Sequence, residues 1–243
     1  VSTIQNFFEI EAIRQKAQLA LDASFSKAFK RPGVLVTSGR LSEQKKQTNL
    51  IDIVATLLKR GVSTRLVILG DGELRADLVR KCLDLKLRTF QVWDQAMVCH
   101  EDYDVYFLGY VANPYQYLAH STLFLFPSGW EGFPLALCEA MISGVAVLSS
   151  DCPTGPREIL APGTIRKSYD LRQAEIAQNG VLLPMLQYPD DLRVWTDTVQ
   201  KLLDDPVLRG QLATQGAKAI QSLDRSAVLP QWHQLVEAVC DGA

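Results

Sequence analysis

Short apolar runs alternate with longer, mostly amphipathic segments along the chain. The short runs have the length of buried strands and cover residues 34–38, 65–70, 105–109, 120–127, 145–149 and 180–184. The longer segments predict helices over residues 49–60, 73–87, 114–119 and 135–142, with another beginning at 154. This alternation predicts an α/β fold with a Rossmann-like, doubly wound, mainly parallel sheet that carries helices on both faces.

The first residues have a helical pattern of their own. Between Ile10 and Phe25, apolar residues recur at threes and fours, and Pro32-Gly33 then interrupts the pattern. We therefore expect one amphipathic helix there. We interpret residues 1–31 as a linker and first helix, and residues 32–243 as one ligand-binding domain with C-terminal helices.

The other end of the chain is predicted to be helical from residue 188, with breaks near Pro206, Leu223 and Pro230. The last helix carries apolar residues that we expect to lie in the core, namely Trp232, Leu235, Val236 and Val239. Residues 88–103 have the least regular pattern and are predicted to form a loop or a small excursion.

Composition excludes several classes of function. The formal net charge of -2 argues against a nucleic-acid surface as the main partner. Five scattered cysteines, without a Cys-x-x-Cys pair, indicate free thiols in a reducing compartment and no metal site. No leader and no apolar run of about 20 residues is visible, so we expect a soluble, cytoplasmic protein.

Polar and glycine-rich turns follow four of the predicted strands. In a parallel sheet, ligands bind beyond the carboxyl ends of the strands, so these turns are candidate binding residues. They comprise Gly39, Arg40 and Lys45, then Gly70-Asp71-Gly72, then Gly109 to Asn113, and finally Ser128, Glu131, Gly132 and Phe133. The glycines allow close backbone approach, the cations suit phosphate, and the carboxylates suit sugar hydroxyls. Together they predict recognition of a nucleoside diphosphate sugar.

Glu139 is the one charged residue between Phe133 and Ser150. A carboxylate buried without partners there would cost several kcal/mol. We therefore expect Glu139 to face a cleft or to hold a ligand. Pro134 is placed to start the helix that carries it, and the free N–H groups at that helix start suit a phosphate.

These residues resemble the motifs of retaining glycosyltransferases of family 4. Glu131-(x7)-Glu139 is similar to the Glu-x7-Glu signature of that family, and Gly39-Arg-Leu-Ser-Glu-Gln-Lys45 to its Gly-Arg-Leu-x-x-x-Lys diphosphate motif. Four further stretches fit its order and spacing: Gly70-Asp-Gly-Glu73, Phe107-Leu-Gly-Tyr-Val111, Gly155-Pro-Arg-Glu158 and Gly180-Val-Leu-Leu-Pro184. The resemblance runs from about Gly33 to the C-terminus, and it implies the C-terminal, donor-binding half of a GT-B enzyme. In that family the last helix packs on the N-terminal domain, so we also expect part of this helix to be uncovered here.

The resemblance implies a role for each candidate residue. Gly39, Arg40 and Lys45 would hold the diphosphate, with the N–H groups of Leu135 and Ala136 nearby. Glu139 would bind the ribose hydroxyls, and the backbone around Val111, with Asn113, would face the base. Glu131 and the Gly132-Phe133 backbone would position the transferred sugar, with Glu131, Arg40 and Lys45 closest to the reaction. Lys46 departs from the family, which often has glycine there.

The resemblance also implies partners. The donor would be UDP- or GDP-linked, with no cofactor and no metal. The acceptor would be a glycan, lipid or small molecule bound through an N-terminal domain, for which residues 1–31 are too few. We therefore expect a fragment that is inactive alone, and peripheral contact with the inner membrane face remains open for the full-length protein.

Other readings remain open. The chain would also suit other GT-B chemistry, in a nucleotide-sugar 2-epimerase or a phosphorylase, or a non-catalytic nucleotide-binding or docking module. Gly155-Pro-Arg157-Glu158 is equally consistent with a helix-capping turn that contains an ion pair.

Overall fold

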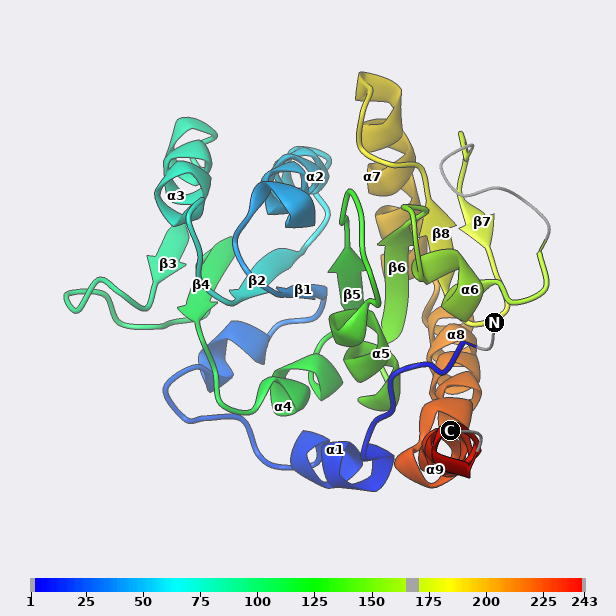
Figure 1. Ribbon diagram of the computed structural model, residues 1–243. Helices are drawn as coiled ribbons and strands as arrows, with labels where there is room; N and C mark the ends of the chain where they lie inside the picture. The colour runs from blue at the N-terminus through cyan, green and yellow to red at the C-terminus, as the bar shows by residue number, and fades with distance from the viewer. Residues whose placement is uncertain (1–2, 165–170, 242–243) are drawn as a thin grey trace.

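The computed structural model describes residues 3–164 and 171–241, and in these residues eight strands form one sheet (Figure 1). The strand order is β3-β4-β2-β1-β5-β6-β8-β7, and all neighbours are parallel except β7 and β8. The strands are β1 (Val34–Ser38), β2 (Arg65–Leu69), β3 (Thr89–Gln91), β4 (Val105–Gly109), β5 (Leu123–Phe126), β6 (Ala146–Ser150), β7 (Glu175–Ile176) and β8 (Val181–Leu183). The predicted fold class is confirmed.

Helices cover both faces of this sheet, as the alternation of buried side chains along each strand requires. On β1, Val34 and Val36 join one core cluster and Leu35 joins the other. The first cluster includes residues of α1 (Ile10–Ala17), α4 (Pro114–Ala119) and α5 (Leu135–Ile142). The second includes residues of α2 (Gln47–Lys59), α3 (Arg75–Asp84) and α7 (Pro189–Asp204). Figure 1 shows these two sets of helices on opposite sides of the sheet.

The remaining helices are α6 (Pro156–Leu160), α8 (Pro206–Ala219) and α9 (Arg225–Asp241), with the 3-10 turns η1 (Ser26–Phe29), η2 (Glu43–Lys45) and η3 (Ile220–Leu223). Strand order reverses between β1 and β5: β2, β4 and β3 extend the sheet on one side, and β6, β8 and β7 on the other. The carboxyl ends of β1 and β5 therefore form the topological switch point, where open α/β sheets bind ligands.

The structure corrects three predicted elements. Residues 88–103 contain the edge strand β3, which pairs with β4, and β7 was not predicted. Helix α1 ends at Ala17 instead of continuing to Phe25. The segment after it turns at Asp22, whose side chain accepts the Ser24 N–H at 2.8 Å and so competes with helical hydrogen bonding.

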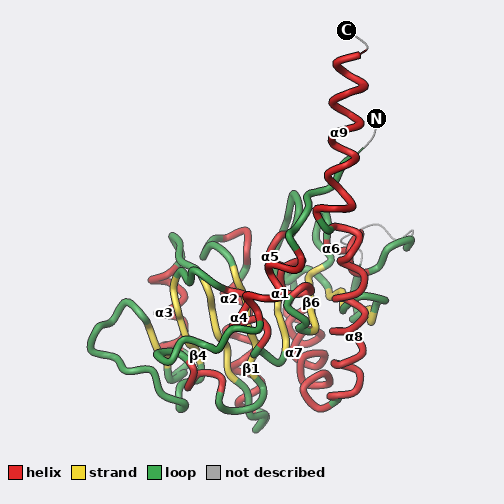
Figure 2. The backbone as a smooth tube through the Cα atoms, turned by 90° about the horizontal axis from the view of Figure 1, so that it is seen from below, coloured by secondary structure: helices red, strands yellow, loops and turns green. Residues whose placement is uncertain are grey.

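Helix α9 differs most from the prediction. Pro230 lies inside the helix and does not break it. Trp232, Leu235, Val236 and Val239 are 39% to 65% exposed, so these four residues lie outside the core, and the expectation that part of the last helix is uncovered is confirmed. Figure 2 shows why: α9 extends away from the body of the domain. None of the helices in residues 3–164 and 171–241 is both long and apolar enough to cross a membrane.

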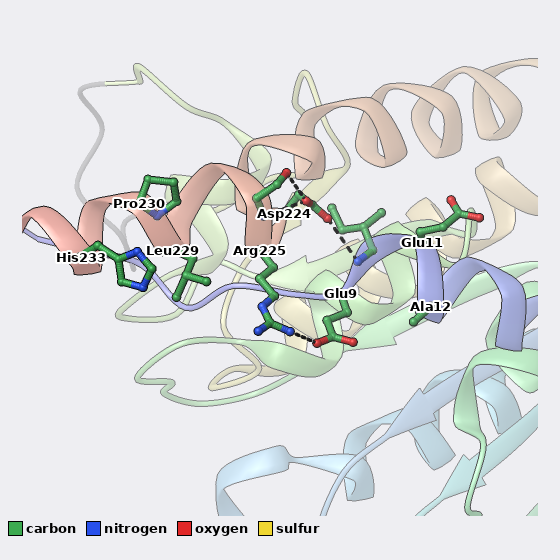
Figure 3. A pocket seen from close by; sticks show the side chains of 10 residues that line it. Glu9, Glu11, Ala12, Asp224, Arg225, Leu229, Pro230 and His233 are labelled. Carbon is green, nitrogen blue, oxygen red and sulfur yellow. Dashed lines mark hydrogen bonds and ion pairs between the residues drawn. The ribbon is translucent and has the colours of Figure 1, made fainter.

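A groove of about 510 Å³ lies where α9 leaves the body, beside the start of α1 (Figure 3). Its apolar floor includes Ile10, Leu229 and Pro230. An exposed ion pair joins Arg225 to Glu9 across it, with 2.7 Å between the guanidinium nitrogen and the carboxylate oxygen. We call this surface the α1–α9 groove.

Candidate functional site

Lys45 and Glu131 meet at the switch point. Lys45 ends the η2 turn that follows β1, and Glu131 lies in the loop after β5. The Lys45 ammonium is 2.6 Å from a Glu131 carboxylate oxygen, and the two side chains are only 20% and 6% exposed. The ammonium also lies 5.0 Å from the centroid of the Phe126 ring. The structure thus brings two residues that are 86 positions apart into one partly buried ion pair.

The backbone around Glu131 is held from two sides. From one side, the Gln44 side-chain amide donates to the Trp130 carbonyl at 2.7 Å. From the other, the Glu131 N–H donates to the Pro153 carbonyl at 2.9 Å, and the Thr154 hydroxyl donates to the Glu131 carbonyl at 3.0 Å. The loops after β1 and β6 therefore fix the loop after β5, and the position of the Glu131 carboxylate is set before any ligand arrives.

The loops after β1 and β2 touch through backbone atoms. A Cβ added at Gly70 would lie 2.1 Å from the Gly39 carbonyl oxygen, and one at Gly72 would lie 2.5 Å from the Leu41 carbonyl oxygen. Gly70 also has a φ of +131°, which favours glycine. The Gly-Asp-Gly stretch is thus a turn that packs tightly on the loop carrying Arg40.

Lys46, where the family often has glycine, has a left-handed backbone with a φ of 52°. It lies between Lys45 and the first residue of α2. Glycine adopts this conformation at no steric cost, whereas a residue with a Cβ does so with strain. The loop therefore follows a glycine-type path although the residue is lysine.

Arg40 lies apart from the Lys45–Glu131 pair. Its side chain is 74% exposed, and its Nε donates to a Glu73 carboxylate oxygen at 2.9 Å. Arg40 does line a cavity of about 340 Å³ at the ends of β1, β2 and β4. Gly39 and Val111 line the same cavity, and Tyr110 stands at its edge with 87% of the residue exposed. The structure thus places two candidate diphosphate residues beside the candidate base residue.

Asn113 is directed away from that cavity. Its side-chain amide donates to the Lys16 carbonyl at 2.9 Å and to the Gln116 side chain at 3.3 Å. These contacts tie α4 to α1. Asn113 therefore has a structural role in this conformation, whereas its predicted neighbour Val111 faces the cavity.

Glu139 lies half-buried on α5 and faces α4. The Tyr115 hydroxyl donates to a Glu139 carboxylate oxygen at 3.3 Å. Burial raises the pKa of Glu139 above its ordinary value, while the hydrogen bond from Tyr115 acts in the opposite direction. Burial and the neighbouring carboxylate raise the pKa of Tyr115 to about 12. Within the described residues, Glu139 thus has one neutral hydrogen-bond donor and no cationic partner.

The start of α5 is open on one side and occupied on the other. A Cβ added at Gly132 would meet nothing within 4 Å, so there is free space beside this residue. The Leu135 N–H donates to the Phe133 carbonyl at 2.9 Å, and Ala136 is partly buried against the core. An anion at this helix start would compete with the Phe133 carbonyl for the Leu135 N–H.

The Gly155-Pro-Arg-Glu158 motif contributes a buried ion pair. Arg157 lies 2.7 Å from Asp151, which follows β6, and 3.1 Å from Glu175. Gly155, with a φ of +97°, packs so closely on Pro134 that a Cβ would lie 2.6 Å from its ring. These contacts support the reading of this motif as a turn with an ion pair, and they hold the loop before α5 in place.

Sequence reasoning missed four residues that build this site: Gln44, Tyr115, Asp151 and Thr154. Asp151 had a usable signal, because it lies two residues after the strand predicted over 145–149. The other three act through contacts between distant segments, and their spacing in the sequence carries no sign of them.

Residues 32–205 match the profile of the family described as "Glycosyl transferases group 1". An uncharacterized glycosyltransferase of Methanocaldococcus jannaschii is 29% identical over 245 residues, which cover 96% of this chain and 57% of that protein. An N-acetylgalactosaminyltransferase of Campylobacter jejuni that acts on a diphospho-undecaprenol is 31% identical over 158 residues, covering 64% of this chain and 36% of that protein. The chain thus spans about half, or less, of these relatives.

Solved structures share the fold. Anabaena HepE, crystallised in complex with UDP, superposes with a TM-score of 0.72 at 20% identity, over 97% of this chain and 57% of that one. The C-terminal domain of a glycosyl transferase group 1 family protein from Francisella tularensis gives a TM-score of 0.58 at 20% identity. That match covers 89% of this chain and 94% of the isolated domain, so the two folds correspond over nearly their whole lengths.

Proposed function

Because this chain belongs to the group 1 glycosyltransferases, we propose that it binds the nucleoside diphosphate sugar donor of a retaining, metal-independent hexosyltransferase. The meeting of Lys45 and Glu131 at the switch point carries this proposal. A phosphate-binding cation and a sugar-binding carboxylate that touch each other match the point where the sugar is joined to the diphosphate.

The donor would lie along the carboxyl edge of the sheet. The base would occupy the cavity beside Val111, and the ribose would bind Glu139. The diphosphate would reach Lys45 and the start of α5, with Arg40 turning inward from Glu73 to join it. The cavity volume of about 340 Å³ is at the lower end of the range for small-molecule sites, which suits a base with part of its ribose.

In the transfer step, the bond between the anomeric carbon and the diphosphate oxygen breaks, and a bond forms to the acceptor oxygen on the same face. The negative charge that develops on the leaving diphosphate is stabilised by Lys45 and Arg40. The acceptor proton passes to the leaving phosphate. Glu131 and the Gly132 backbone hold the sugar hydroxyls in place. We also propose that the 243-residue chain alone transfers little or no sugar, because it covers only 57% of its Methanocaldococcus jannaschii relative and the acceptor would bind to the part of such an enzyme that it does not match.

Calorimetry and thermal denaturation with UDP, GDP and ADP, each with and without EDTA, test donor binding. UDP comes first because HepE was crystallised with it. One diphosphate should stabilise the protein by about 2.7 kcal/mol at 100 times its dissociation constant, with or without EDTA. The proposal fails if none of the three diphosphates, nor any of their hexose conjugates, binds at millimolar concentration.

Turnover assays distinguish the related chemistries. Acceptor-dependent loss of nucleotide sugar by a longer form of the protein indicates a transferase, whereas interconversion of nucleotide sugars without acceptor indicates an epimerase. Robust sugar transfer by the 243-residue chain itself would contradict the proposal that this chain binds the donor but transfers little or no sugar alone.

A further inference from the structure

Tyr115 is the side chain that contacts the Glu139 carboxylate. It belongs to α4, which starts at Pro114 on the wall of the cavity beside Val111, and its hydroxyl reaches across to α5. The two helices pack against each other, so the contact joins neighbouring elements of one face of the sheet (Figure 1). The tyrosine ring itself packs on the core cluster of that face.

This arrangement restricts what the carboxylate can do. One oxygen of Glu139 accepts the Tyr115 hydroxyl at 3.3 Å, and that bond limits rotation about the terminal torsion of the side chain. The neutral tyrosine hydroxyl satisfies one oxygen of the Glu139 carboxylate and leaves its negative charge in place. An arginine or lysine would neutralise that charge. The other oxygen keeps its capacity to accept hydrogen bonds from a pair of neighbouring hydroxyls.

We propose that Tyr115 is a positioning residue, which orients the half-buried Glu139 carboxylate so that its second oxygen receives the ribose hydroxyls of the donor. The inference rests on the proposed function. It adds a residue on α4 to the site, outside both the Glu131-(x7)-Glu139 stretch and the cavity lining. The proposal also connects the base cavity to the ribose position. Pro114 lines that cavity, and the next residue, Tyr115, contacts the carboxylate that would bind the ribose.

The test measures affinity for UDP and for 2′,3′-dideoxy-UDP in Tyr115→Phe, which keeps the ring and removes the hydroxyl. We expect UDP affinity to fall about tenfold, which corresponds to about 1.4 kcal/mol, because the hydrogen bond that orients the charged Glu139 carboxylate is lost. The affinity for 2′,3′-dideoxy-UDP should change less than about twofold, because the hydroxyls that Glu139 would receive are missing.

Tyr117→Phe is the matched control. Tyr117 is on the same helix, but it is buried and its ring packs toward Phe25 and Phe29. The same loss of a hydroxyl there should leave both affinities unchanged. Melting temperatures of the variants separate loss of folding from loss of binding.

Glu139→Gln completes the test. In that background, Tyr115→Phe should weaken UDP binding by less than about twofold, because both changes remove one interaction. Equal losses for UDP and 2′,3′-dideoxy-UDP in Tyr115→Phe would overturn the inference and leave the proposed function standing. A wild-type protein that binds no nucleoside diphosphate would overturn the proposed function, and the inference with it.

Discussion

The switch point and the α1–α9 groove each hold an ion pair, but the two pairs differ in how far they are buried. At the switch point, the Lys45–Glu131 pair is largely buried, and its partners come from loops after different strands. In the groove, the Arg225–Glu9 pair has side chains that are 54% and 60% exposed. The groove has a volume of about 510 Å³, against about 340 Å³ for the cavity at the ends of β1, β2 and β4.

The difference shows that volume alone is a poor guide to chemistry in this fold. A pair at the surface is screened by water and contributes little energy, whereas a buried pair is costly unless its geometry is fixed or a ligand shares it. In this domain the buried Lys45–Glu131 pair lies where the strand order reverses, whereas the α1–α9 groove lies where α9 leaves the body.

Of the variants that compare the switch point with the groove, Lys45→Ala should have the largest effect on nucleotide affinity and stability. Affinity for UDP should fall by about 30-fold or more, and affinity for UMP by less, because a charge-assisted contact to the diphosphate is lost while Glu131 keeps its negative charge. The unpaired Glu131 carboxylate should also cost on the order of 2–3 kcal/mol of stability. Calorimetry and urea denaturation measure the two effects.

The double variant Lys45→Ala/Glu131→Gln separates the effect on stability from the effect on binding. Its stability should return toward that of the wild type, while its UDP affinity stays low. Recovery of UDP affinity in the double variant would show that Lys45 acts only by neutralising Glu131. That result would contradict the proposed contact between Lys45 and the diphosphate.

The pH dependence of UDP binding is the next test. Because burial raises the pKa of Glu139, its carboxylate should gain a proton at a pH above the ordinary glutamate value of about 4.3. The proposed ribose contact should therefore weaken on acidification, while the folded state itself is relieved of a buried charge and gains stability. Both trends should be smaller in Glu139→Gln, which leaves the titration of UDP unchanged. Identical pH profiles for the two proteins would contradict the ribose role.

A smaller effect is expected at Lys46. Lys46→Gly should raise stability by up to about 1 kcal/mol, because glycine adopts the left-handed conformation without strain. Lys46→Ala is the matched control, since it removes the same side chain but keeps the Cβ and should bring no such gain. A gain in Lys46→Ala as large as that in Lys46→Gly would mean that the lysine side chain, and not the backbone, carries the cost.

The groove should give the smallest effect. Arg225→Ala breaks the exposed pair with Glu9 and should change stability by no more than about 1 kcal/mol. It should leave UDP affinity unchanged. A clear loss of nucleotide affinity in this variant would show that the two regions are coupled.

Much of the fold was predictable because its local signals agree. The helices over 114–119 and 135–142 have the predicted bounds, with a proline at or just before each start and Gly144 shortly after the second. Strand β3 was missed because Thr89–Gln91 is three residues long, and its pairing with β4 supplies the order that its own sequence lacks. The apolar face of α9 was assigned to the core because periodicity shows that a face is apolar and not whether anything covers it.

The site followed a similar division. Residues on the strand-end turns were predictable from one rule about parallel sheets, and the structure brings Lys45 and Glu131 together. The tyrosine that contacts Glu139 was not predictable, because the hydrogen bond joins two helices whose residues are 24 positions apart. Asn113 fits the pattern of a turn residue in the sequence, but its amide is engaged by α1.

The contact between Gly70 and Gly39 limits which positions can be mutated to evolve a new donor preference in this domain. Even the smallest side chain at Gly70 would collide with the neighbouring loop, so mutational libraries aimed at this position should return few folded proteins. Tyr110 and Gly132, by contrast, border open space and should accept side chains of different sizes. Diversity in nucleotide and sugar choice should therefore be introduced at the rim, while the glycine contact beneath it is kept constant.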